Sequence, residues 1–138
     1  MFDSFSESLF GRLKVFITRF FNARKIFPKI RGTQPVLLKR QTYHEVREKM
    51  LNNNYDYTQP ENQIGGYQLA DSNIFYVGDG HHRMAAAMDI YWETGNVEPV
   101  RNLISYGIWS LTARPPVGGG IFPAFSFLGR VRNFLTFF

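Results

Sequence analysis

The chain has 138 residues, a formal net charge of +5 and no cysteine, which excludes disulfides, thiolate zinc sites and cysteine nucleophiles. Its hydrophobic content of 44% suffices for the core of one domain, and no apolar run has the length that spans a bilayer. The charge is uneven, at +7 over residues 1–40, −5 over residues 41–112 and +3 over residues 113–138. If a polyanion binds, the basic N-terminal part must supply much of the attraction.

The sequence predicts three consecutive parts. Residues 1–34 form a basic amphipathic arm with a linker, residues 35–112 form a compact domain, and residues 113–138 form a Phe-rich C-terminal segment. We expect the apolar residues of this last segment to pack against another part of the protein, for which the N-terminal helix is a candidate.

Residues 4–27 have the pattern of an amphipathic helix. Ser4 and Glu7 form a capping-box signature. The apolar side chains that follow at helical spacing are Phe5, Leu9, Leu13, Phe16 and Phe20. Basic residues occupy much of the remainder, so three interpretations stay open: packing on the protein's own core, docking of a partner, and binding to a membrane surface. The run from Lys29 to Pro35 reads as a linker.

The next elements are shorter. Val36-Leu37-Leu38 is a strand candidate, and a second capping box at Thr42 predicts a helix of about ten residues through Met50. Tyr43, Val46 and Met50 are expected to face inward and His44 to lie on the surface. The segment from Tyr55 to Asn62 should be irregular, and Glu61 and Gln63 are candidates to approach the turn described below.

A hairpin and a helix follow. Residues 64–70 and 73–77 read as its two strands, and the helix should run from about Gly80 to Thr94 and stop before Gly95. Its core face is formed by Met84, Ala87, Met88 and Tyr91. The stretch from Val97 to Leu111 is expected to supply one or two strands, with Trp109 as an anchor.

The junction between that hairpin and that helix carries the candidate site. Its residues are Gly78, Asp79, Gly80, His81, His82 and Arg83. The first amides of a helix have no intrahelical partner and point toward an anion, and glycines let the backbone approach a ligand closely. Arg83 can clamp a phosphate and is expected to be exposed, so that its loss should cost little stability. Adjacent histidines point in different directions, so we expect one to be chemical and the other structural. Both His81 and His82 are catalytic candidates, and His82 is the favoured one.

These residues, with Ala86 further on, resemble the signature turn of the ParB/sulfiredoxin-like superfamily in its DGHHR form. The order of elements from about Val36 to Trp109 fits the same pattern, roughly half of the chain. The resemblance implies a small α+β fold with a short mixed sheet and two to three helices, beside the N-terminal amphipathic helix. It also implies a phosphate site at the helix N-terminus. The chain lacks the cysteine that sulfiredoxins use and the Glu-Arg-Arg turn of chromosome-partitioning ParB proteins.

Three functional hypotheses follow. The first is a ParB-like nuclease, a bacterial phosphodiester hydrolase of the kind found as a polymorphic-toxin module. Arg83, Gly78, Gly80 and the helix amides would hold the phosphate, a histidine would act as general acid or base, and Asp79 would orient it or hold a metal. The second is a nucleotide-binding or phosphotransfer domain that uses the same turn, with Asp71, Asp79 and Asp89 around a Mg²⁺-bound nucleotide. The third is a non-catalytic module that binds a partner or a membrane.

The sequence does not determine a cofactor; a divalent metal such as Mg²⁺ is the candidate, and the expected ligand is a nucleic acid or a nucleotide. A toxin module would also have an immunity protein and a larger carrier as partners. It would act in the cytoplasm, or be delivered into the cytoplasm of a target cell. DNA, RNA and nucleotide substrates are not distinguished by the sequence.

Overall fold

The computed structural model describes residues 2–33, 39–116 and 120–121, with side chains from residue 9 to residue 116 of those ranges. The helices are α1 (Phe2–Ile26), α2 (Arg40–Leu51), the short 3-10 helix η1 (Pro60–Asn62), α3 (His81–Thr94) and α4 (Glu98–Tyr106). The strands are β1 (Lys29–Gly32), β2 (Gly65–Leu69), β3 (Ile74–Asp79), β4 (Ile108–Thr112) and β5 (Gly120–Ile121). The protein is therefore an α+β domain with a small mixed sheet, as predicted.

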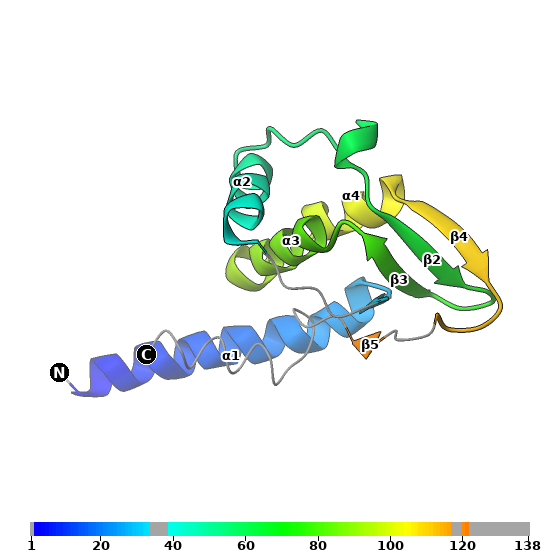
Figure 1. Ribbon diagram of the computed structural model, residues 1–138. Helices are drawn as coiled ribbons and strands as arrows, with labels where there is room; N and C mark the ends of the chain where they lie inside the picture. The colour runs from blue at the N-terminus through cyan, green and yellow to red at the C-terminus, as the bar shows by residue number, and fades with distance from the viewer. Residues whose placement is uncertain (1, 34–38, 117–119, 122–138) are drawn as a thin grey trace.

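The sheet has the order β4-β2-β3-β1-β5, with β3 near its middle (Figure 1). β2 and β3 form the predicted antiparallel hairpin, with Tyr67 opposite Tyr76. β1 pairs with β3 in parallel, so that Gly32 lies opposite Val77. The linker predicted for Lys29 to Pro35 is thus wrong over its first four residues, which form a strand. Pairing with β3 stabilises that strand. No local pattern in the sequence indicates pairing with a segment so far along the chain.

α3 is the central helix of the domain and packs against α1, α2 and α4 (Figure 1). Its buried side chains include the predicted core face of Met84, Ala87, Met88 and Tyr91. The helix ends at Gly95, which takes the left-handed conformation with φ 79° and donates its N–H to the Tyr91 carbonyl. The predicted extent and core face of this helix are confirmed. Three small alanines in its middle are almost fully buried, which allows close packing on this helix.

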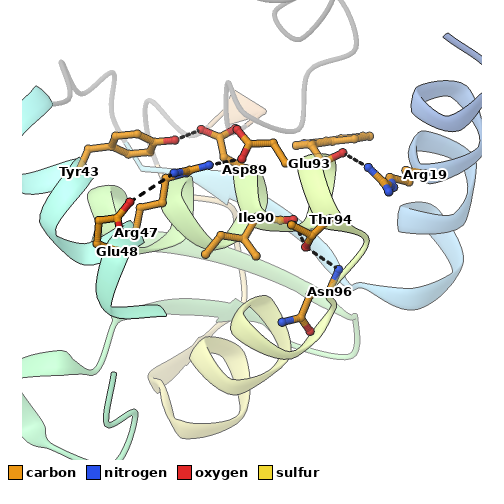
Figure 2. A network of polar contacts seen from close by, with 10 residues as sticks. Arg19, Tyr43, Arg47, Glu48, Asp89, Ile90, Glu93, Thr94 and Asn96 are labelled. Atoms are coloured by element: carbon orange, nitrogen blue, oxygen red, sulfur yellow. Dashed lines mark hydrogen bonds and ion pairs between the residues drawn. The ribbon is translucent and has the colours of Figure 1, made fainter. Parts of the chain in front are cut away.

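α2 is tied to α3 by a polar network as well as by apolar contacts. Tyr43 donates a hydrogen bond to Asp89, and Arg47 forms an ion pair with Glu93 (Figure 2). Burial, reinforced by the bond to Asp89, raises the pKa of Tyr43 above its ordinary value. Met50 is buried in the core, and Tyr43 and Val46 pack against it, as predicted.

Two predicted elements differ from the structure. α2 begins at Arg40 with Lys39 as its N-cap, so the capping box at Thr42 lies inside the helix. The stretch from Val97 to Leu111 is predicted to supply one or two strands; it supplies one, β4, and its first part, Glu98–Tyr106, forms the helix α4, which was not predicted. Val100 and Leu103 lie three residues apart and are both buried, which is helical spacing within a run that is apolar enough to resemble a strand.

Trp109 is half-buried against the core, and its ring meets the Phe75 ring edge-on with the two centroids 4.9 Å apart, as predicted for an anchor.

Other predictions fall outside the described residues. The strand candidate Val36-Leu37-Leu38 and the packing expected of residues 122–138 lie outside the described residues, as do the side chains of the capping box at Ser4.

In the described part of the chain, no helix combines the length and the apolar character needed to cross a membrane.

The turn between β3 and α3 depends on a glycine. Gly80 has φ 102°, and a Cβ atom at this position would lie 2.3 Å from Cγ2 of the buried Ile64. Replacement Gly80→Ala should therefore lower the free energy of unfolding by roughly 2–4 kcal/mol, because it combines a left-handed backbone with overpacking. Gly11→Ala is the matched control, since nothing lies within 4 Å of its Cβ position on α1. It should raise stability by up to about 1 kcal/mol. Denaturant unfolding of both variants measures this, and equal effects would contradict it.

Candidate functional site

The candidate site is the turn at which β3 becomes α3. β3 ends at Asp79, Gly80 takes the left-handed conformation, and α3 begins at His81. No side chain of the described residues caps this helix start, so the first amides of α3 are not taken up by a capping residue. Gly78 and Asp79 are exposed. The arrangement offers backbone N–H donors and the positive end of a helix dipole to an anion.

The turn lies at the carboxyl edge of two parallel strands, β1 and β3. Thr33, which directly follows β1, donates from its backbone N–H to the Val77 carbonyl at 3.1 Å and from its hydroxyl to the same oxygen at 3.3 Å. The carboxyl edge of parallel strands is where α/β proteins commonly bind ligands. Thr33 therefore belongs to the surroundings of the site.

His82 is held by the beginning of α2. Its Nε2 atom accepts a hydrogen bond from the backbone N–H of Lys39 at 2.7 Å. An imidazole nitrogen that accepts a bond carries no proton, so the neutral ring has its proton on Nδ1. The ring nitrogen that remains available to a ligand is then Nδ1, which is an N–H donor. A proton on Nε2 would break the contact with Lys39.

His81 points into the protein, as its 7% exposure indicates. Burial lowers its pKa below the usual value, the neighbouring His82 acts in the same direction, and Asp79 opposes them. The ring is therefore held in the neutral form, which suits a structural residue. The two histidines follow each other in sequence but have separate environments.

Arg83 is half-buried, where exposure was expected. Its guanidinium donates to the Glu61 carbonyl at 2.6 Å and to the Gln63 carbonyl at 3.4 Å. It also interacts with the hydroxyl of Tyr55, which itself donates to the Asn62 carbonyl at 2.6 Å. Burial raises the pKa of Tyr55 to about 12, although the guanidinium acts against that rise. Arg83 thus fixes the segment before β2, and Glu61 and Gln63 approach the turn through their backbone oxygens.

His82 and Arg83 contact different segments of the chain. His82 accepts the backbone N–H of Lys39, the N-cap residue of α2, whereas Arg83 donates to the carbonyls of Glu61 and Gln63, which precede β2. The turn thus combines the uncapped start of α3 with an imidazole and a guanidinium that are each held by another segment.

The acidic residues named for a Mg²⁺-bound nucleotide do not gather at the turn. Asp71 lies in the loop before the start of β3, Asp79 lies at its end, and Asp89 accepts the bond from Tyr43 at the interface with α2. Within residues 9–33 and 39–116, no group of three or more His, Cys, Asp or Glu side chains is placed to hold a metal ion. His44 is exposed on α2, as expected, and packs against the Tyr43 ring.

Thr33, Lys39 and Tyr55 lie near the turn without having been predicted from the sequence. Thr33 and Lys39 flank a stretch that was interpreted as a linker followed by a strand, and recognising β1 as a strand parallel to β3 would have placed Thr33 at the edge of the site. No sequence pattern predicted that Tyr55 lies near the turn, because an aromatic residue in an irregular segment has many possible partners.

Comparison of the chain with protein-family models, with curated proteins and with solved structures gave no match.

The buried state of His81 makes stability depend on pH. The unfolded chain takes up a proton near the ordinary histidine pKa of 6.5, whereas the folded protein does so only at lower pH. The free energy of unfolding should therefore have its full value above pH 6.5 and fall as the pH drops below 6.5. Thermal unfolding at a series of pH values measures the slope. His81→Gln should flatten it and the exposed His44→Gln should retain it; an unchanged slope in His81→Gln would contradict the assignment.

The tether formed by Arg83 can be tested by its contribution to stability. Arg83→Met removes both bonds to the carbonyl oxygens and should lower the free energy of unfolding by about 1–3 kcal/mol. Arg101→Met is the matched control, because Arg101 is exposed and has only a 3.9 Å ion pair with Glu98. Its loss should cost less than about 1 kcal/mol. Equal stability of the two variants in denaturant unfolding would show that the tether is absent in solution.

Proposed function

We propose that this protein is a phosphodiester hydrolase, a ParB-like nuclease whose substrate phosphate binds at the turn of residues 78–83. The observation that carries the proposal is the start of α3 without a side-chain cap, at the carboxyl edge of β1 and β3, where His82 and Arg83 are each held by another segment. The sequence of the turn supports the same activity through its resemblance to the ParB/sulfiredoxin-like superfamily.

The first turn of α3 would bind the phosphate through its backbone N–H groups. Gly80 sets the direction of this helix start, because its left-handed conformation turns the chain from β3 into α3 directly against Ile64. Arg83 keeps two of its N–H groups on the carbonyls of Glu61 and Gln63, and those bonds orient the remaining donors of a rigid fork. The guanidinium then stabilises charge that grows on the phosphoryl oxygens.

His82 would act as a neutral hydrogen-bond donor. With Nε2 on the N–H of Lys39, the ring offers Nδ1–H to a phosphoryl oxygen, where negative charge increases in the transition state. Asp79 is the exposed carboxylate of the turn, and we propose that it accepts the proton of the attacking water. Water then forms the new bond to phosphorus, the bond to the leaving oxygen breaks, and the water proton passes to the Asp79 carboxylate.

The toxin-module hypothesis remains part of this proposal, with an immunity protein and a carrier as its partners. It rests on the resemblance of the turn to modules of that kind. Nucleotide binding is the less favoured function, because the acidic residues that would hold a metal-bound triphosphate lie apart.

Substitution of His82 tests the proposal. The full chain is incubated with supercoiled plasmid, with tRNA and with nucleoside triphosphates, each with Mg²⁺ and with a chelator. We expect nicking or cleavage of a nucleic acid, and we expect His82→Ala to lower kcat by about 10²–10³-fold with little change in KM, because one donor to the transition state is lost.

His44→Ala is the control for this experiment, because it removes an exposed histidine outside the turn. It should retain full activity. Asp79→Asn should lower kcat by about 10²–10⁴-fold. Full activity of His82→Ala would contradict the role assigned to the turn. Binding of a triphosphate without cleavage of either polymer would contradict the hydrolase and favour the nucleotide-binding function.

A further inference from the structure

α1 carries two separate apolar stripes, and only one of them packs on the domain. Phe16 and Phe20 stack on the Trp92 ring with centroid distances of 5.3 and 6.2 Å, and Phe27 meets the Tyr91 ring edge-on at 5.0 Å. The Tyr91 hydroxyl also donates to the backbone carbonyl of Arg19 at 2.7 Å, and the Arg19 guanidinium donates to the Trp92 carbonyl. We call Phe16, Phe20 and Phe27 the inner stripe, and it fixes α1 against α3.

The second stripe is exposed to solvent. Its members are Phe10, Leu13, Ile17 and Phe21, with exposures of 69%, 40%, 37% and 56%. They follow one another at three or four positions, so they lie along one side of the helix. We call these four residues the outer stripe. Packing of α1 on the core leaves this stripe uncovered, since the inner stripe already contacts α3.

The surroundings of the outer stripe are predominantly basic. Residues 8–44 contain nine Lys or Arg and no Asp or Glu, whereas Glu7 lies three positions before Phe10 at the beginning of the stripe. Lys14 follows Leu13, and Arg24 and Lys25 lie three and four positions after Phe21, so these cations stand beside the stripe; all three are exposed. Large apolar side chains that are exposed together mark an interaction site, and the excess of positive charge favours an anionic partner.

We propose that the outer stripe of α1 binds the surface of an anionic lipid membrane. The helix lies in the plane of the headgroups, with its four apolar side chains among the upper acyl chains and Lys14, Arg24 and Lys25 on the lipid phosphates and carboxylates. The inner stripe simultaneously holds the domain, so the whole protein is carried to the surface.

The cations beside the outer stripe argue against two other binding partners. A second copy of the chain would bring the same cations to the interface, and like charges would repel. Residues 122–138 of this chain are apolar, but their charged residues are Arg130 and Arg132. An anionic lipid surface satisfies both the apolar stripe and the cations beside it.

Sedimentation with lipid vesicles tests this proposal on the full chain. Vesicles of phosphatidylcholine are compared with vesicles in which part of that lipid is replaced by phosphatidylserine, at low and at high salt. We expect binding to the anionic vesicles that weakens with salt. Phe10→Ser combined with Phe21→Ser should lower the partition coefficient by roughly tenfold or more. Lys14→Gln combined with Lys25→Gln should lower it about fivefold per charge on anionic vesicles alone.

Val15→Ser is the matched control, because Val15 is 46% exposed on α1 but lies off the outer stripe. It should bind vesicles as the natural sequence does, and circular dichroism shows that every variant is folded. Equal binding of Val15→Ser and the double Phe variant, or binding that ignores lipid charge, would overturn the proposal. So would a dimer that the double Phe variant dissociates, or a fall in the Tm of that variant without lipid, since the stripe would then be covered by protein.

Discussion

The packing of Gly80 on Ile64 is the constraint on which the domain depends. Ile64 is almost fully buried, and its carbonyl accepts the N–H of Ile108, so the same residue positions the start of β4. Because Gly80 can take a left-handed conformation directly against this side chain, the chain passes from β3 into α3 without an intervening loop. α3 can then lie between α1, α2 and α4. The core and the candidate site consequently share one turn, and a change in that turn affects both.

The beginning of α3 distributes three consecutive side chains to three environments. Successive residues of a helix are about 100° apart, so the side chains of His81, His82 and Arg83 leave the helix in three different directions. His81 enters the core, His82 meets Lys39, and Arg83 meets the carbonyls of Glu61 and Gln63. The geometry of the site is thus set by segments distant in sequence. This explains why Arg83 has a structural role beside any role in binding, and why its replacement cannot separate the two.

The sequence predicted the elements whose information is local. The amphipathic pattern of α1, the hairpin of β2 and β3, and the end of α3 at Gly95 all come from spacing and turn residues. It failed where partners are distant. Lys29–Gly32 resembles a linker because its strand character depends on pairing with β3, and α2 begins at Arg40 next to the contact between Lys39 and His82. The six candidate residues were found as a group, but the contacts that separate their roles required the fold.

Two groups of exposed cations have different surroundings. Lys39 and Arg40 are exposed at the beginning of α2, next to His82, whereas Lys14, Arg24 and Lys25 are exposed on α1. The salt dependence of binding to a polyanion grows with the number of phosphates that are neutralised. Under the two proposals made above, lipid would take up the cations of α1, and Lys39, Arg40 and Arg83 would be the cations next to the turn. The turn would then contact a short segment of its substrate, because the cations of α1 would not be available to a longer strand.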